Sequence, residues 1–368
     1  MTRVITISST TPAEAAIAES AAALLAGKLV AFATETVYGV GALASDPEAM
    51  DRLRQLKDRP SRPFSVHLGT PAELKAYVGT PPSAATRLIQ KAWPGPVTLL
   101  LAVGGQLADP QLRGLHDALV HEDMIGLRCP DHAATQAMLS AVHKPVVAPS
   151  ANRAGQPSPR TAAEVLAGLE GRIDLLVDSG PTRYGKDSTI VRVDPQGWQV
   201  VREGVYDRGA IARMMRKVVV LVCTGNTCRS AMAEGIARRV LAQRLNVPVS
   251  RLGEHGYEVL SAGVFAAPGM PATQEAVQAA AAQGVDISAH RSRPLTAELI
   301  RRADVVFCMT GVHADQARQL APDQADKILP LWTGGDILDP VGGGAEIYYR
   351  TAELIEQALR ARADEGLL

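Results

Sequence analysis

The sequence alternates apolar segments with amphipathic segments, and this alternation starts a second time in the middle of the chain. The second series begins with an apolar run at 217–223, KVVVLVC, followed by a run with helical spacing at 230–245. Three further apolar runs follow, at 257–263, 303–310 and 327–332. Apolar strands joined by helices favour a parallel sheet covered on both faces. We therefore expect the second half to be an α/β domain with a four-stranded, parallel, doubly wound sheet.

The first half contains similar signals in a less regular order. A helix is expected within 12–26, where Gly27 would end it before an apolar strand. Further strands are expected at 96–103, 124–130, 144–150 and 187–194, and further helices at 47–59, 161–171 and 207–216. We place the domain boundary at Arg216, giving domains of residues 1–216 and 217–368.

Length, charge and cysteine content exclude several classes of protein. With 368 residues, the chain is too long for one typical domain and long enough for two. Its 38 basic residues balance its 38 acidic ones, so global charge gives no argument for a nucleic-acid-binding or membrane-surface protein. The sequence shows no apolar run of roughly 20 residues, no signal peptide and, with four cysteines, no disulfide framework. We expect a cytoplasmic protein with no membrane partner.

The segment VCTGNTCRS connects the first strand of the second half to its first helix. Such a loop directs successive backbone N–H groups at one point, which suits a phosphate dianion. The same groups and Arg229 favour the thiolate form of Cys223, and the thiolate is the nucleophilic form. The planar guanidinium can hold two phosphate oxygens, and Ser230 can donate to the thiolate. Gly225 and Asn226 tolerate the left-handed backbone of a tight loop.

Other readings of the two loop cysteines fit less well. A zinc site would need a second Cys or His pair nearby, which the sequence lacks. A dithiol redox pair would have C-x-x-C spacing, which Cys223 and Cys228 do not have. Two roles for Cys228 remain open: it packs beneath the loop, or it forms a disulfide with an oxidised Cys223 and protects it from further oxidation.

The second half resembles the low-molecular-weight protein tyrosine phosphatases. The resemblance covers residues 217–368 and rests on Cys-x5-Arg-Ser after the first strand, with SAG, HRSRPLT, ADVVFCM and DILDP further along. It implies a metal-free and cofactor-free mechanism in which Asp339 protonates the leaving group. The implied catalytic residues are Cys223, Arg229 and Asp339. The implied phosphate-binding loop also contains Thr224, Gly225, Asn226, Thr227, Cys228 and Ser230.

Two positions bear on the substrate of this half. Thr227 stands where tyrosine-specific relatives commonly have a larger aliphatic residue, and CTGNTCRSAMAE is similar to bacterial protein-arginine phosphatases. Val341 stands where the family usually has an aromatic residue. We expect phosphoarginine in proteins as the substrate, with phosphotyrosine as the alternative. Arsenate reduction is disfavoured because Cys308 lies inside an expected strand and no resolving pair is evident.

The first half lacks a G-x-x-x-x-G-K-[ST] loop, but it has polar residues at the ends of apolar runs. TETVYG, Lys-x-Arg and PSAN, in this order, resemble the YrdC-like threonylcarbamoyl-AMP synthases over residues 13–216. The resemblance implies a twisted, mixed α/β sheet. It also implies synthesis of threonylcarbamoyl-AMP and pyrophosphate from L-threonine, bicarbonate and ATP, for N6-threonylcarbamoyladenosine formation in tRNA.

The resemblance assigns roles to single residues of the first half. Those implied for threonine binding are Thr36, His67, Arg128 and Ser188. Those implied for ATP binding are Lys57, Arg59, Ser150, Asn152, Ser158 and Arg202. ATP would carry Mg²⁺ with few or no direct protein ligands. The implied partners are other tRNA threonylcarbamoylation proteins, with tRNA as a further candidate. The alternative is a module that binds RNA or nucleotide without synthase activity.

Overall fold

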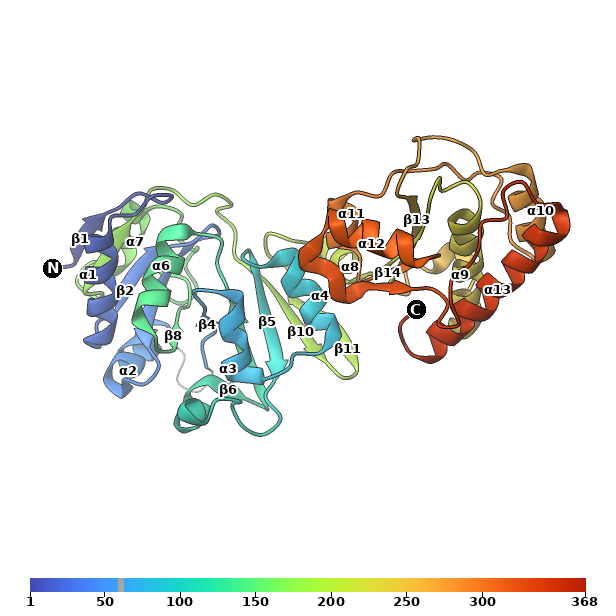
Figure 1. Ribbon diagram of the computed structural model, residues 1–368. Coiled ribbons are helices and arrows are strands. Elements are labelled where there is room, and N and C mark those ends of the chain that lie inside the picture. Colours follow the sequence, from blue (N-terminus) through green and yellow to red (C-terminus); the bar gives the residue numbers. More distant parts are fainter. Residues whose placement is uncertain (59–62) are drawn as a thin grey trace. The chain divides into compact units, whose positions relative to one another are not determined.

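The computed structural model describes residues 1–58 and 63–368 and divides into two compact units, Met1–Met214 and Met215–Leu368 (Figure 1). Each unit has its own sheet and its own core. Arg59, which we expected to bind ATP, lies outside the described residues.

The first unit contains a mixed sheet with the strand order β1-β9-β2-β3-β8-β4-β7-β5-β10-β11, and β6 pairs with β7 at one side. Its strands are β1 (Arg3–Thr6), β2 (Val30–Ala33), β3 (Tyr38–Leu43), β4 (Val66–His67), β5 (Val97–Ala102), β6 (Val120–His121), β7 (Met124–Arg128), β8 (Val146–Val147), β9 (Leu175–Asp178), β10 (Thr189–Asp194) and β11 (Gly197–Arg202). Parallel pairs such as β4–β7 and β5–β10 alternate with antiparallel pairs such as β2–β3 and β5–β7. The expectation of a mixed sheet is therefore confirmed.

The helices of the first unit differ in how they are capped. They are α1 (Glu14–Leu25), α2 (Pro47–Leu56), α3 (Lys75–Val78), α4 (Ser83–Ala92), α5 (His116–Leu119), α6 (Ala133–Val142), α7 (Ala162–Leu169) and α8 (Arg208–Met215). Gly27, with a φ of 73°, follows the end of α1 as predicted. Asp46 caps α2 by accepting a hydrogen bond from the Ala49 amide at 3.0 Å.

The second unit is a four-stranded, all-parallel sheet with the order β13-β12-β14-β15. Its elements are β12 (Lys217–Cys223), α9 (Arg229–Leu245), β13 (Tyr257–Gly263), α10 (Gln274–Ala282), α11 (Ala297–Arg302), β14 (Val305–Cys308), α12 (Gly311–Leu320), β15 (Ile328–Pro330) and α13 (Ala345–Asp364). In Figure 1, α9, α10 and α13 gather on one side of this sheet, and α11 and α12 lie on the other. This arrangement confirms the predicted doubly wound parallel sheet.

The side chains of β12 explain why both faces need helices. Val219 and Leu221 belong to the cluster with α9 and α13, whereas Val218 and Val220 belong to the cluster with α11 and α12. All four side chains are buried.

In the part of the chain that the structure describes, no helix is both long and apolar enough to cross a membrane.

The topology of the second unit determines where a ligand can bind. β12 comes first in the chain and lies between β13 and β14. The chain therefore passes from β12 to β13 on one side and later returns to β14 on the other side of β12. Ligands of open α/β sheets bind at such a switch point, outside the carboxyl ends of the strands. The segment after Cys223 lies at this point.

Candidate active sites

The loop after β12 turns its backbone carbonyl groups outward. The carbonyls of Cys223, Thr224 and Thr227 accept hydrogen bonds from the amides of Val264, Phe265 and Thr273, each at 3.0 Å. The Asn226 carbonyl accepts one from His290 Nε2 at 2.7 Å. Within the described residues, the loop amides from 225 to 228 have no acceptor. These amides are therefore available to an anion held inside the loop.

A polar network beneath the loop fixes the position of Cys223. Its sulfur lies 2.9 Å from the Ser230 hydroxyl, and Asn226 Nδ2 donates to that hydroxyl at 2.9 Å and to the Ser261 hydroxyl at 2.8 Å. Ser261 in turn donates to Glu234 at 2.6 Å. Asn226 has a φ of 56°, the left-handed backbone expected from the sequence. The Ser230 hydroxyl can donate either to the Cys223 sulfur or to the Ala262 carbonyl, which lies 3.4 Å away.

Arg229 joins the loop to the segment that carries Asp339. Its Nη1 donates to the Ile337 carbonyl at 3.0 Å, and its Nη2 donates to Asp339 Oδ2 and, at 3.4 Å, to the Thr224 hydroxyl. The side chain is buried, and its Nε has no partner among the described residues. An unpaired N–H on a buried guanidinium marks a position for an additional acceptor. The structure thus brings Cys223, Ser230, Arg229 and Asp339 together.

The two residues expected to bear on substrate choice differ in exposure. Thr227, in the loop, is half-buried, and Val341, two residues after Asp339, is exposed. Cys228 is buried, with its sulfur 3.5 Å from the Thr273 hydroxyl and 3.7 Å from the Tyr348 hydroxyl. Cys223 and Cys228 are both free cysteines, so the structure represents the reduced state of the loop.

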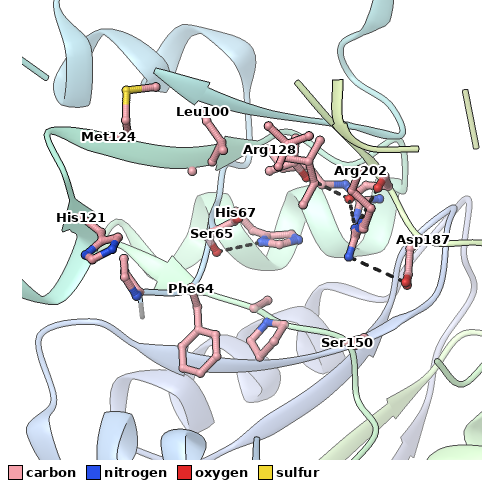
Figure 2. Close-up of a pocket in the computed structure, with 18 of the residues that line it drawn as sticks. Phe64, Ser65, His67, Leu100, His121, Met124, Arg128, Ser150, Asp187 and Arg202 are labelled. Atoms are coloured by element: carbon pink, nitrogen blue, oxygen red, sulfur yellow. Dashed lines mark hydrogen bonds and ion pairs between the residues drawn. The ribbon is translucent and has the colours of Figure 1, made fainter. Parts of the chain in front are cut away.

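The first unit contains a cavity of about 430 Å³ whose walls come from separate strands and loops. Its lining includes six of the predicted site residues: Lys57, His67, Arg128, Ser150, Ser188 and Arg202. In Figure 2, His67, Arg128, Asp187 and Arg202 surround the same hollow. Residues that are far apart in the sequence are therefore neighbours here.

Arg128 occupies the end of β7 and forms a buried ion pair with Glu35. Its Nη2 donates to Glu35 Oε1 at 2.9 Å and to the Thr36 hydroxyl at 2.7 Å, while Glu35 Oε2 accepts from the Asp131 amide at 3.1 Å. Thr36 is fully buried behind the guanidinium and does not line the cavity. Arg128 Nε has no partner in the described part of the chain. This guanidinium is therefore fixed on one side and can take a further acceptor on the other.

His67 lies at the end of β4, next to Arg128 in the paired strand. Its Nδ1 donates to the Ser65 carbonyl at 3.3 Å. Burial, together with the positive charge of Arg128, lowers the pKa of His67 to about 3. The imidazole is consequently neutral near pH 7, and its Nε2 is an acceptor.

Lys57, at the end of α2, is held against the loop after β8. Its ammonium donates to the Ser150 carbonyl at 2.9 Å, the Asn152 carbonyl at 2.7 Å and Asn152 Oδ1 at 2.8 Å. Ser150 Oγ donates to the same Oδ1 at 2.5 Å. The predicted Lys57, Ser150 and Asn152 therefore form one hydrogen-bonded group.

The strands β10 and β11 supply the opposite wall. The Ser188 hydroxyl lies 2.9 Å from the Thr98 hydroxyl, and Arg202 Nη2 donates to the Ser188 carbonyl at 2.8 Å. Ser158 does not line the cavity, but it donates to Asp187 at 2.8 Å, and Asp187 does line it. Ser158 is therefore placed behind this wall.

Sequence reasoning left several partners of these residues out of the predicted sites. Glu35 lies within TETVYG and Asp187 directly precedes Ser188, so both were adjacent to identified residues. Ser261 and His290 lie in segments that supported the resemblance without an assigned role. Their only signal was a polar residue at or near the end of an apolar run, which does not reveal the partner.

Two family models match the chain, on either side of the division between its two units. Residues 22–204 match the Sua5/YciO/YrdC model, which is described as "Telomere recombination". Residues 218–365 match the model described as "Low molecular weight phosphotyrosine protein phosphatase".

Individual relatives agree with both matches. A threonylcarbamoyl-AMP synthase of Bacillus subtilis is 38% identical over 177 residues, covering 48% of this chain and 49% of the relative. One of Chromohalobacter salexigens is 35% identical over 175 residues, covering 47% of this chain and 90% of the relative. A protein-arginine-phosphatase of Bacillus subtilis is 40% identical over 152 residues, covering 40% of this chain and 95% of the relative. This chain thus spans about half the length of the first relative.

A solved structure described as Pyrococcus abyssi Sua5 complexed with L-threonine has a TM-score of 0.52 with 22% identity, and the match covers 98% of each chain. At this identity the likeness concerns the fold. Together with the family models and the relatives, it agrees with the two α/β units found here. The chain therefore belongs to the Sua5/YciO/YrdC family in its first half and to the low molecular weight phosphotyrosine protein phosphatase family in its second half.

Proposed function

We propose that this chain is a bifunctional enzyme that makes threonylcarbamoyl-AMP in its first unit and dephosphorylates proteins in its second. The observation that carries the phosphatase is the inward-facing amide loop around Cys223, next to Arg229 and Asp339. The observation that carries the synthase is the cavity that unites Lys57 with Arg128.

The phosphatase reaction follows from these contacts in two steps. The Cys223 thiolate attacks phosphorus, forming an S–P bond while the bond from phosphorus to the leaving atom breaks, and Asp339 gives that atom its proton. Asp339 then takes a proton from water, whose oxygen attacks phosphorus and releases phosphate and the thiolate. The loop amides and Arg229 stabilise the charge that develops on the phosphoryl oxygens in both steps.

Asp339 Oδ2 accepts a hydrogen bond from Arg229 Nη2 and so pairs with this side chain. A phosphoryl group that takes over Arg229 would release Asp339. The released carboxyl group could then approach the leaving atom, so substrate binding and the placement of Asp339 are coupled through one guanidinium.

Phosphoarginine in proteins is the substrate we propose for this site. Thr227 places a small hydroxyl within the loop, and a relative that is 40% identical over 152 residues is named a protein-arginine-phosphatase. A hydroxyl can hydrogen-bond a guanidinium or a water, whereas an aliphatic side chain cannot. Hydrolysis of phosphoarginine and phosphotyrosine peptides should be compared in wild type and in Thr227→Val. We expect wild type to prefer phosphoarginine and the variant to lose about tenfold of that preference. Preference of wild type for phosphotyrosine would reject the assignment.

The first unit offers a place for each charged part of the synthase substrates. The free Nε of Arg128 can donate to the threonine carboxylate, and neutral His67 can accept from the threonine amine or hydroxyl. Lys57 can approach a phosphate while its present acceptors hold it in position. Mg²⁺ would accompany ATP. The described residues contain no group of three metal-ligating side chains, so phosphates and water would supply most of its ligands.

A nucleotide- or RNA-binding module without synthase activity is the competing proposal for the first unit. The test is an assay of pyrophosphate and threonylcarbamoyl-AMP with L-threonine, bicarbonate, ATP and Mg²⁺. We expect both products, each dependent on threonine. The product would then serve proteins that transfer threonylcarbamoyl groups to tRNA. ATP binding without pyrophosphate release under saturating substrates would favour the binding module.

A further inference from the structure

His313 lies directly beside the phosphatase loop and has no role in the steps above. It belongs to the first turn of α12 and is 5% exposed. Each of its ring nitrogens faces a threonine hydroxyl: Nε2 lies 2.9 Å from Thr224 Oγ1, and Nδ1 lies 2.8 Å from Thr310 Oγ1. A buried imidazole with one hydroxyl at each nitrogen is fully hydrogen-bonded in its neutral form.

The two hydroxyls have different further contacts. Thr310 is the N-cap of α12, and its Oγ1 accepts from the His313 amide at 3.4 Å. Thr224 Oγ1 accepts from Arg229 Nη2 at 3.4 Å. Thr310 is half-buried, whereas Thr224 is exposed at the mouth of the loop.

These contacts allow two arrangements of the protons. In the first, Thr310 donates to Nδ1, and Nε2–H donates to Thr224. In the second, Nδ1–H donates to Thr310, and Thr224 donates to Nε2. The second arrangement leaves the half-buried Thr310 hydroxyl proton without an acceptor among the described residues. The first leaves free only the proton of the exposed Thr224, which water or a ligand can accept, so the first is favoured.

In the first arrangement, the oxygen of Thr224 accepts two hydrogen bonds, one from His313 and one from Arg229. Its single proton must then point elsewhere. The loop that contains Thr224 begins at Cys223, the residue that would attack the phosphoryl group, so a phosphoryl oxygen in this loop is a suitable acceptor.

The charges around His313 keep the network in one state near neutral pH. Burial, followed by the positive charge of Arg229, lowers the pKa of His313 to about 4, although Asp339 and Asp336 act in the opposite direction. The imidazole is therefore neutral over the range in which a phosphoprotein phosphatase would operate.

We propose that His313 is a positioning residue of the phosphatase site, which holds the Thr224 hydroxyl as a hydrogen-bond donor toward the phosphoryl group bound in the loop. This inference rests on the proposed phosphatase function. In this proposal, the Thr224 hydroxyl joins the backbone amides as a hydrogen-bond donor to the phosphoryl group. His313, which lies outside the loop, determines the orientation of that hydroxyl.

The position of the imidazole proton can be measured without any activity. In the full chain labelled with ¹⁵N-histidine, the signals of His313 are identified by their loss in His313→Gln. At pH 7 we expect the neutral form with the proton on Nε2. The Nδ1–H form or a charged ring would overturn the proposal, whether or not the chain is a phosphatase.

The role of Thr224 can be tested by a double-mutant cycle on para-nitrophenyl phosphate hydrolysis and on inhibition by inorganic phosphate. Thr224→Val should lower kcat/KM about 10- to 100-fold and weaken phosphate binding, because a hydrogen bond to a charged group is lost. His313→Leu should cause a similar loss in wild type and little further loss in Thr224→Val. Equal losses in both backgrounds would show a merely structural role and overturn the proposal.

A conservative variant separates the hydrogen bond from packing. The side-chain amide of His313→Gln can donate from the position of Nε2–H, so this variant should retain most activity while His313→Leu does not. Thermal unfolding of each variant confirms that the unit is folded. If wild type hydrolysed no phosphorylated substrate, the proposed function would fail, whereas the tautomer measurement would still decide the proton assignment.

Discussion

The two candidate sites of this chain are assembled in opposite ways. The phosphatase site lies mainly in one loop, whose residues from Cys223 to Ser230 share a strand end and a helix start, and only Asp339 comes from afar. The synthase cavity takes its residues from the end of α2, from strands such as β4, β7 and β11, and from the loops between strands. In the contiguous loop, the backbone of the loop itself sets the positions of the site residues. In the cavity, those positions depend on the pairing of the strands in the whole sheet. Substitutions should therefore act locally on function in the first case, and on function and stability together in the second.

The largest effect is expected in the contiguous site. Arg229→Lys keeps the charge but loses the planar fork that contacts Ile337 and Asp339. Phosphatase kcat/KM should fall on the order of 10³-fold or more, as for other arginines that stabilise a transferring phosphoryl group. Arg350→Lys, on an exposed helical ion pair, is the matched control and should be neutral. Full activity in Arg229→Lys would show that the reaction does not need the Arg229 guanidinium.

A substitution in the synthase cavity should lower the stability of the first unit. Arg128→Met leaves Glu35 buried without its partner, and the free energy of unfolding of the first unit should drop by about 3–5 kcal/mol. Arg183→Met breaks a pair with Asp131 in which both side chains are about half exposed, so about 1 kcal/mol or less is expected. Urea unfolding of the full chain, followed by Trp93 and Trp198 fluorescence in a Trp332→Phe background, measures both. Similar losses in the two variants would contradict the buried pairing.

The remote acid residue should contribute less than the loop arginine. Asp339→Asn cannot transfer a proton, and kcat should fall about 10²- to 10³-fold for a substrate with a poor leaving group. The loss should be smaller for an aryl phosphate, whose leaving group departs without full protonation. Single-turnover kinetics on both kinds of substrate test this. Equal losses on the two would indicate that Asp339 acts through its ion pair with Arg229 rather than as the acid.

A smaller effect should appear in the pH dependence of the stability of the first unit. His67 has an ordinary pKa of 6.5 in the unfolded chain and one of about 3 in the folded chain. Between these values the unfolded state binds the extra proton, so the stability of the first unit should fall with decreasing pH, by about 1.4 kcal/mol per pH unit from this residue. His67→Asn should flatten the profile over that window. An unchanged slope would show that His67 is not held neutral.

The sequence predicted the second unit almost completely because its signals are local. Each strand is an apolar run, and the loop after β12 is identified by its own residues. The first unit was predicted less well. The strand β3, with the sequence YGVGAL, carries two glycines, and a Cβ at Gly41 would lie 2.7 Å from the ring of Phe32. That glycine follows from a neighbouring strand, which a local pattern cannot reveal.

The site residues show the same limit. Arg128 was identified as a threonine-binding residue, but its ion pair with Glu35 requires the end of β7 to lie beside the segment after β2. His313 was not identified at all, since its environment depends on Thr224, which is 89 residues away. Which residues become hydrogen-bond partners across such long distances in the sequence is determined by the folded sheet.

We propose that one chain carries two separate catalytic sites. The most direct measurement assays pyrophosphate release from L-threonine, bicarbonate and ATP, and phosphate release from phosphoarginine peptides, in the full chain and in Cys223→Ser and Lys57→Met. We expect both activities in wild type, loss of only phosphate release in Cys223→Ser, and loss of only pyrophosphate release in Lys57→Met. Absence of either activity from folded wild type, or loss of both in one variant, would contradict it.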